Sequence, residues 1–196
     1  MANPPGEKKL RILQTLASML EDPKGEKITT AALAARLDVS EAALYRHFAS
    51  KAQMYEGLIE FIESSVFGLI NQITGSEEDG LQQVKAMLTM LLNFAEKNPG
   101  MTRVMTGEVL LHENTRLQDR MNQFVDRVEL SLKQAYRIAL TQHAQQRLSA
   151  DADPSILANA ATAFVVGRWQ RYAKTAFAKK PTDGPAALNL FVRTGI

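Results

Sequence analysis

The sequence predicts an all-α protein that consists of a small N-terminal module and a larger helical body. Its long segments repeat apolar residues at the three-to-four-residue spacing of an amphipathic helix, and none shows the strict alternation typical of a strand. The breaks between these segments coincide with clusters that contain proline or glycine. The 196 residues, of which 45% are hydrophobic, suffice to bury a sizeable core.

Composition argues against several other classes of protein. No stretch approaches the roughly 20 apolar residues that cross a bilayer, and the first residues lack the basic and apolar regions of a signal peptide. The absence of cysteine excludes disulfides and thiolate metal sites, and it fits a reducing compartment. A net charge of +2 gives little overall attraction for nucleic acid. We therefore expect a cytoplasmic protein whose electrostatic preferences are local.

The N-terminal module has the pattern of a helix-turn-helix. A first helix is expected over about residues 7–21 and ends at Pro23-Lys24-Gly25. Thr29 then caps a short alanine-rich helix, Leu37-Asp38-Val39 forms a tight turn, and Ser40 caps a second short helix. We expect small side chains where the helices cross and one small shared core: Ala34 and Ala35, then Leu33, Leu37, Val39, Leu44 and Phe48.

The second short helix is suited to contact DNA. Small residues near its N-terminus let the backbone approach the major groove, and its polar side chains lie off the apolar stripe. Lys51 lies at the start of the next helix, where the helix dipole favours a phosphate. The candidate DNA-binding residues are Thr29, Thr30, Ser40, Ala42, Tyr45, Arg46, His47 and Lys51. The alternative is a helical hairpin in an ordinary bundle, with Tyr45 and His47 on its surface.

Four longer helices are expected in the body, over about residues 50–74, 81–97, 116–146 and 154–178. Asp153 is the expected N-cap of the last one, with Pro154 at its first position. The last two helices, one rich in alanine, suit a four-helix interface across a two-fold axis. A dimer would also place two DNA-reading units about 34 Å apart, as a pseudo-palindrome requires. We predict a DNA-binding domain over 1–51 and a dimerisation and partner-binding domain over 52–196.

Three surface features of the body bear on possible partners, and two of them allow two interpretations. Phe61 lies about 100° from Ile62, off the centre of the apolar stripe. It is either covered by a neighbouring helix or dimer partner, or it is an exposed anchor for another protein. The corner Glu96-Lys97-Asn98-Pro99-Gly100 is typical of a solvated helix end. A run of basic residues contains no Asp or Glu: Arg168, Arg171, Lys174, Lys179 and Lys180. It is either a solvated face or a surface that attracts an acidic partner, and we favour the solvated face.

The recognition-helix residues resemble the TetR family of DNA-binding proteins. The pattern Val-Ser-x-x-x-Leu-Tyr-x-His-Phe-x-x-Lys is filled from Val39 to Lys51. This resemblance implies a TetR-like fold, with an N-terminal three-helix module and a C-terminal helical dimerisation body. The body of such proteins usually binds a small effector, so a ligand-responsive transcriptional repressor is the alternative function.

Further stretches are similar to the nucleoid occlusion factors within this family: Leu58–Glu63, Asn93–Arg103, Thr106-Gly107, Arg116–Gln123 and Pro181–Asp183. The resemblance implies a dimer that binds dispersed chromosomal sites, antagonises the division protein FtsZ while on DNA, and so blocks division over the nucleoid. It places the FtsZ-binding surface at Phe61, Lys97 and Asn98, and thereby favours the exposed-anchor interpretation of Phe61. Lys97 suits an acidic FtsZ tail, and Phe61 suits its apolar residues.

Two departures from this resemblance concern the binding surfaces. Asn93 replaces the small residue expected near the partner groove, and the arm Lys8-Lys9-Leu10-Arg11 is less basic than expected.

No pattern predicts an enzyme, a cofactor or a metal site. His47, His112 and His143 are too far apart in sequence to suggest metal ligation. The chain has no cysteine nucleophile, glycine-rich phosphate loop or Gly-x-Ser-x-Gly elbow. The polar candidates for an effector cavity do not converge in sequence: Thr89, Asn93, Tyr136 and Asn159.

Overall fold

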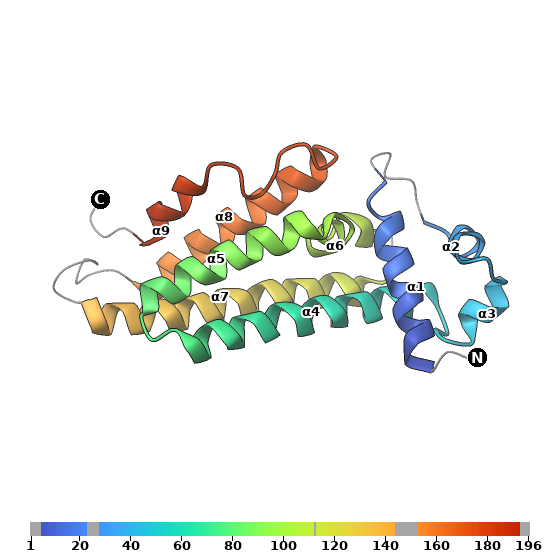
Figure 1. Ribbon diagram of the computed structural model, residues 1–196, viewed down its shortest axis with the longest axis horizontal. Coiled ribbons are helices and arrows are strands. Elements are labelled where there is room, and N and C mark those ends of the chain that lie inside the picture. The colour runs from blue at the N-terminus through green and yellow to red at the C-terminus, as the bar shows by residue number, and fades with distance from the viewer. Residues whose placement is uncertain (1–4, 23–27, 112, 144–152, 193–196) are drawn as a thin grey trace.

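The computed structural model describes residues 5–22, 28–111, 113–143 and 153–192. These residues are helical, with turns and without a strand among them, which confirms the all-α prediction (Figure 1). The helices are α1 (Pro5–Met19), α2 (Thr30–Leu37), α3 (Glu41–Tyr45), α4 (Lys51–Ser76), α5 (Gly80–Lys97), α6 (Pro99–Met105), α7 (Thr115–His143), α8 (Pro154–Lys174) and α9 (Asn189–Val192), with 3₁₀ turns η1 (Glu108–Leu110) and η2 (Pro185–Leu188). None of the helices described is long and apolar enough for a membrane span.

Helices α4, α5, α7 and α8 form an elongated body, and α1–α3 lie together at one end of it (Figure 1). Within the body, α7 packs against α5 and α8, and α4 packs against α5 and α7. The module contacts the body through α1, which lies against α4 and α6. Because α4 begins beside the module and runs along the body, it belongs to both the predicted DNA-binding and partner surfaces.

Side-chain caps explain where the long helices begin. The Ser50 hydroxyl accepts from the Gln53 backbone N–H at 3.2 Å, and the Asp79 carboxylate accepts from the Leu81 N–H at 2.8 Å. The Asp153 carboxylate accepts from the Ser155 N–H at 2.7 Å, and Pro154 opens α8. The prediction for the start of this last helix is therefore confirmed.

The body core is built around Trp169, which is 1% exposed. Its ring stacks on Phe124 with centroids 6.4 Å apart, and its indole N–H donates to the Leu91 carbonyl at 3.2 Å. The Tyr136 hydroxyl donates to the Phe191 carbonyl at 3.0 Å, which fastens α9 to α7. Burial raises the pKa of Tyr136 above its ordinary value.

Several predicted boundaries need correction. The first helix covers 5–19 instead of 7–21, and its predicted stop at Pro23–Gly25 lies outside the described residues. The helix predicted over 116–146 is described to residue 143. The last predicted helix ends at Lys174 instead of 178, because Ala176 and Phe177 adopt positive φ values of 48° and 67° and turn the chain. Leu69, which continues the apolar spacing of Leu58, Ile62 and Val66 on α4, is nevertheless 37% exposed.

Candidate DNA-binding surface and partner surface

The helix-turn-helix is shaped by short-range contacts of its own residues. The Thr29 hydroxyl accepts from the Ala32 N–H at 3.1 Å, and the Ser40 hydroxyl accepts from the Ala43 N–H at 3.2 Å. Both predicted N-caps are therefore confirmed. Asp38 ends α2 in the left-handed region with φ 56°, which lets the chain reverse within a tight turn.

One residue of the predicted small core and one of the two predicted crossing alanines are not buried. Leu33, Leu37, Leu44 and Phe48 are buried as expected, whereas Val39 is 44% exposed. Val39 directly follows the left-handed Asp38, where the chain reverses, and it lies at the surface. Ala35 is also exposed, so that of the two alanines only Ala34 is buried.

The polar face of α3 is open to an incoming ligand. Tyr45 is 46% exposed, Ala42 and Arg46 are exposed, and His47 is partly buried. The side chains of Tyr45 and Arg46 form no hydrogen bond or ion pair with any residue that the structure describes. Their donors are therefore available to phosphate or base edges without the loss of a contact within the protein.

The hydroxyls at the starts of α2 and α3 form hydrogen bonds within the protein, and these bonds use only part of their hydrogen-bonding capacity. The Thr30 hydroxyl donates to the Glu41 carboxylate at 2.6 Å and ties α2 to α3. Thr29 and Ser40 accept from backbone N–H groups, so each keeps an O–H donor that can reach a phosphate.

Lys51 has a partner that the sequence did not indicate. Its ammonium lies 2.5 Å from the Glu113 carboxylate, with 21% of the Lys51 side chain exposed, and 5.6 Å from the centre of the Tyr55 ring. Burial, with a smaller contribution from Glu113, raises the pKa of Tyr55 to about 12. A phosphate at the start of α4 would therefore have to compete with Glu113 for Lys51.

The structure adds two basic residues of α1 to the DNA-binding candidates. Lys8 and Arg11 of α1 line a pocket of about 190 Å³ that also includes Val39, Ala43 and His47. The sequence analysis noted this arm only as weakly basic. The i, i+3 spacing of Lys8 and Arg11, which places them on one face of a helix, is the pattern that could have identified them.

The predicted partner residues lie on α4 and at the end of α5. Phe61 is 40% exposed, so the described helices leave a large part of its side chain uncovered. Lys97 is exposed in the last turn of α5, while the Asn98 side-chain amide donates to the Phe94 carbonyl at 2.7 Å and closes that helix. Because α4 and α5 are antiparallel neighbours, Phe61 and Lys97 lie toward the same end of the body (Figure 1).

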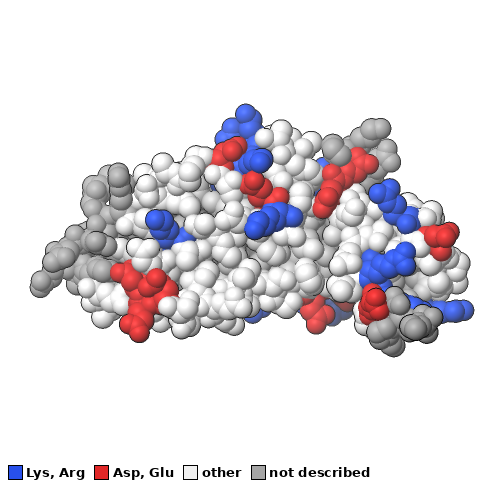
Figure 2. All heavy atoms as spheres, in the orientation of Figure 1, with Lys and Arg blue, Asp and Glu red and all other residues white. Residues whose placement is uncertain are grey.

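An open groove of about 580 Å³ runs along α4 and α5 beyond these residues. Its apolar lining includes Leu69, Ile73 and Met90, and Asn93 lies on its rim as an exposed side chain. Figure 2 shows a broad uncharged area on the face that carries α4 and α5. Leu69 is thus exposed, unexpectedly from the sequence, because it lines this groove.

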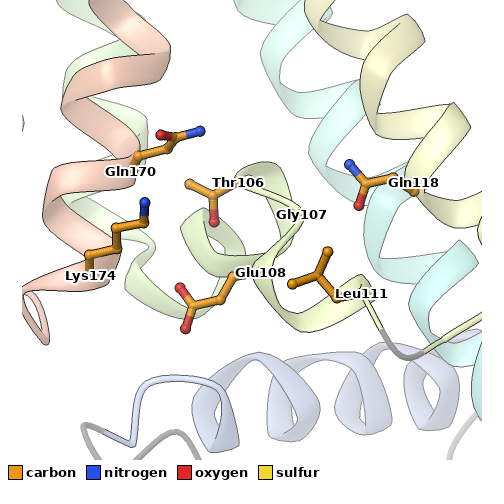
Figure 3. A pocket seen from close by; sticks show the side chains of 7 residues that line it. All are labelled: Thr106, Gly107, Glu108, Leu111, Gln118, Gln170 and Lys174. Atoms are coloured by element: carbon orange, nitrogen blue, oxygen red, sulfur yellow. The ribbon is translucent and has the colours of Figure 1, made fainter.

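The polar residues considered for an effector cavity do not come together. Thr89, Asn93 and Asn159 are exposed, and only Tyr136 is buried. A separate pocket of about 200 Å³ lies where the α6–η1 segment meets α7 and α8, and none of the four lines it. Figure 3 shows Gln170 and Lys174 projecting from α8 on one side of this segment and Gln118 from α7 on the other.

Metal ligation finds no support among the residues described, because they contain no group of three histidines, cysteines or carboxylates suited to hold an ion. Of the three histidines considered, His112 and the side chain of His143 lie outside the described residues.

Similar solved structures have the same fold. A TetR transcription regulator from Haloarcula marismortui matches with a TM-score of 0.76 at 14% identity, over 95% of this chain and 97% of that chain. The transcriptional regulator FadR from Bacillus subtilis, solved with stearoyl-CoA, matches with a TM-score of 0.73 at 9% identity, over 95% and 98%. The TetR-like fold prediction is therefore confirmed.

Comparison of sequences identifies the family more closely. Residues 26–58 match the model of bacterial regulatory proteins of the tetR family, and residues 78–192 match the SlmA-like model of the tetracyclin repressor-like C-terminal domain. Nucleoid occlusion factor SlmA of Idiomarina loihiensis is 45% identical over 93% of this chain and 92% of that protein. SlmA of Aliivibrio fischeri is 48% identical over 88% and 87%. The chain belongs to the SlmA family of nucleoid occlusion factors, within the TetR-type DNA-binding regulators.

Proposed function

We propose that this nucleoid occlusion factor binds specific chromosomal sites as a dimer, antagonises FtsZ assembly while on DNA, and so blocks division over the nucleoid. The observation that carries this proposal is the exposed Phe61 on α4, the helix whose first residue is the phosphate candidate Lys51 and whose later turns line the groove with α5. The relatives named nucleoid occlusion factors support the cellular role. The corresponding location is the nucleoid in the cytoplasm.

DNA binding is assigned to the face of α2 and α3. Arg46 and Tyr45 are the exposed candidates on α3, and the hydroxyls of Thr29, Thr30 and Ser40 surround the N-terminal ends of the two helices. Apart from Thr30, whose O–H would first have to leave Glu41, these groups suit phosphate contacts that position the module, with Ala42 leaving space for the groove floor. The division of the chain after residue 51 remains part of this proposal, and α4 begins there.

Dimerisation is assigned to the outer faces of α7 and α8. Leu130 on α7 is 62% exposed, and Ile156 on α8 is 68% exposed. The exposed side of α8 continues from Ile156 with Ala160, Ala163 and Gly167 at helical spacing. Large exposed apolar side chains beside small ones suit close packing against the same helices of a second copy.

FtsZ binding is assigned to Phe61, Lys97 and Asn98. A partly exposed phenylalanine gives an aromatic anchor with area to bury, as at energetic centres of protein interfaces. Lys97 adds a positive charge for an acidic segment of FtsZ, and such a charge acts mainly on association rate and specificity.

Sedimentation of purified FtsZ with GTP tests the proposal. The protein is added with and without DNA that carries its preferred site. We expect less pelletable polymer only when protein and DNA are both present. An unchanged amount of polymer in every mixture, with DNA binding intact, would contradict the proposal and favour the alternative of a conventional ligand-responsive repressor.

Substitutions at Phe61 and Lys97 separate the two surfaces. Phe61→Ala and Lys97→Glu should each abolish the effect on FtsZ and leave the affinity for DNA within twofold. Leu111→Ala is the matched control for Phe61→Ala, because Leu111 is 71% exposed and lies on the α6–α7 connection, away from the groove. Equal loss of both activities in the Phe61 or Lys97 variants would mean that these residues maintain the fold.

A further inference from the structure

Glu96 lies directly before the partner residue Lys97 and is held from a distant part of the chain. The Thr182 hydroxyl donates to one of its carboxylate oxygens, and the Lys180 ammonium lies 3.3 Å from the other. Its backbone carbonyl accepts from the Tyr172 hydroxyl at 3.2 Å. All three partners belong to α8 or to the segment that follows it. Figure 2 shows acidic and basic side chains gathered where the end of α5 meets this segment.

The segment that holds Glu96 is itself fixed. The Arg168 side chain donates to the Pro181 carbonyl at 2.9 Å, and Pro181 is buried. Earlier in the segment, Ala176 and Phe177 adopt positive φ values, which residues other than glycine rarely do. The Phe177 ring packs edge-on against Tyr172 with centroids 5.1 Å apart. These contacts hold the backbone in an unfavourable conformation and place Lys180 and Thr182 next to Glu96.

The basic run at the C-terminal end is therefore not simply a solvated face. The side chains of Arg168 and Lys180 both make defined contacts, whereas those of Arg171, Lys174 and Lys179 form no hydrogen bond or ion pair with any described residue. This difference between neighbours could not be seen in the sequence, where Lys179 and Lys180 are equivalent.

The charge balance at the corner depends on Lys180. Lys97 and Lys180 are positive and Glu96 is negative, so the three together carry one positive charge. Lys97 forms no ion pair with any residue that the structure describes. The hydrogen bond from Thr182, with Lys180, holds the pKa of Glu96 below its ordinary value, so this carboxylate stays ionised near neutral pH. Without Lys180, an acidic partner would meet a corner with no net charge.

We propose that Lys180 and Thr182 are positioning residues of the partner surface, because they hold and offset Glu96 so that Lys97 meets an acidic segment of FtsZ with net positive charge. This inference rests on the function proposed above and extends its surface to residues 180–182. The end of α5 and the segment after α8 would then together form the surface that meets FtsZ.

A purely structural role for these contacts makes a different prediction. If they only fasten the C-terminal segment to α5, Glu96→Gln weakens the fastening and lowers the effect on FtsZ. If their role is electrostatic, Glu96→Gln keeps an acceptor for Thr182 and raises the charge of the corner. The Glu96→Gln exchange then compensates for the loss of Lys180.

The experiment is FtsZ sedimentation with GTP and site DNA, titrated with four variants. Lys180→Ala should require about threefold more protein for half-maximal effect, a modest change because the ion pair is exposed. Lys179→Ala, the matched control with the same charge change one residue away, should stay within 1.5-fold, roughly the scatter expected when a rim charge makes no contact. Glu96→Gln alone should equal or exceed the unchanged protein, and Lys180→Ala with Glu96→Gln should return to its level.

Two further measurements complete the test. DNA affinity should be the same for all variants, and the difference caused by Lys180→Ala should shrink at about 0.5 M salt, where charges at the surface are screened. FtsZ that lacks its acidic tail should not distinguish Lys180→Ala from Lys179→Ala.

The outcomes separate the inference from the function on which it rests. If the unchanged protein with DNA has no effect on FtsZ, the proposed function is wrong. If it acts on FtsZ but Lys180→Ala equals Lys179→Ala, or Glu96→Gln does not restore the double variant, the electrostatic role of Lys180 is wrong. Intact fluorescence of the buried Trp169 in each variant excludes unfolding as the cause.

Discussion

The DNA-binding face and the partner corner of this protein are built by contacts of different range. Thr29 and Ser40 cap their helices through residues three positions away, and the Thr30–Glu41 bond spans 11 positions. At the corner, the bonds from Tyr172 and Thr182 to Glu96 span 76 and 86 positions. The shape of the first surface is therefore a local property of its sequence, whereas the second exists only once the body has folded.

The two regions meet at a close junction between α1 and α6. Gly100 lies so near α1 that a Cβ there would stand 2.0 Å from the Ala17 carbonyl oxygen. The buried Arg103 donates to the carbonyls of Leu20 and Asp22 at 3.1 and 2.8 Å, and its guanidinium lies 4.9 Å from the Phe177 ring. The locally built module is thus fixed to the body by groups from α6 and from the segment after α8.

The largest expected effect comes from emptying the core of the module. Leu44 is 1% exposed, so Leu44→Ala should destabilise the module by about 2–5 kcal/mol and abolish DNA binding. We expect urea unfolding followed by Trp169 fluorescence, which reports the body alone, to keep its midpoint. Leu190→Ala is the matched control, because Leu190 is 65% exposed.

A Trp169 midpoint that falls together with the module signal would show that the contrast between the two regions is wrong. The junction at Gly100 and Arg103 would then join them into one cooperative unit.

A smaller effect is expected from the cap of α2. Thr29→Ala removes both the cap and a phosphate contact, so the affinity for DNA should fall about tenfold, equivalent to about 1.4 kcal/mol. Fluorescence anisotropy with labelled site DNA measures this change. Thr141→Ala removes a hydroxyl that donates to the Arg137 carbonyl on α7 and should leave DNA affinity unchanged. Unaltered DNA affinity in Thr29→Ala would remove Thr29 from the interface.

The smallest expected effect concerns Glu113, where the body reaches the module. Glu113→Gln releases Lys51 for phosphate, so DNA affinity should rise about threefold, in the range of a single exposed or partly exposed ion pair. Glu113→Asp keeps the charge and serves as the control. An unchanged or weaker affinity in Glu113→Gln would mean that Lys51 does not contact DNA.

Tyr55 provides a second readout of the same substitution. Its pKa is raised to about 12 by burial first and Glu113 second, so Glu113→Gln should lower the pKa only in part. Because the folded pKa lies above the ordinary value of 10.0, the neutral phenol stabilises the fold fully below pH 10, and this stabilisation is lost as the pH rises through about 12. Absorbance of tyrosinate during alkaline titration measures the change, and no difference between the two proteins would argue against this contact.

Local sequence was sufficient to predict the elements of the module and the body helices. Caps such as Thr29, Ser40 and Asp153 act on backbone groups two or three residues away, so their effect can be inferred without a tertiary structure. The body helices follow from apolar periodicity for the same reason. The assignment of Phe61, Lys97 and Asn98 came instead from resemblance to a family.

Tertiary structure decided which side chains are exposed and which charges are paired. Val39 and Leu69 fit an apolar stripe as well as their buried neighbours do, yet both lie at the surface. Val39 follows the left-handed Asp38, and Leu69 lines an open groove. The ion pair of Lys51 with Glu113 joins residues 62 positions apart, and only the fold makes Lys180 differ from Lys179. The sequence by itself determined helices, turns and their caps, because these depend on neighbouring residues. The pairing of charges and the exposure of surfaces depend on how distant segments pack.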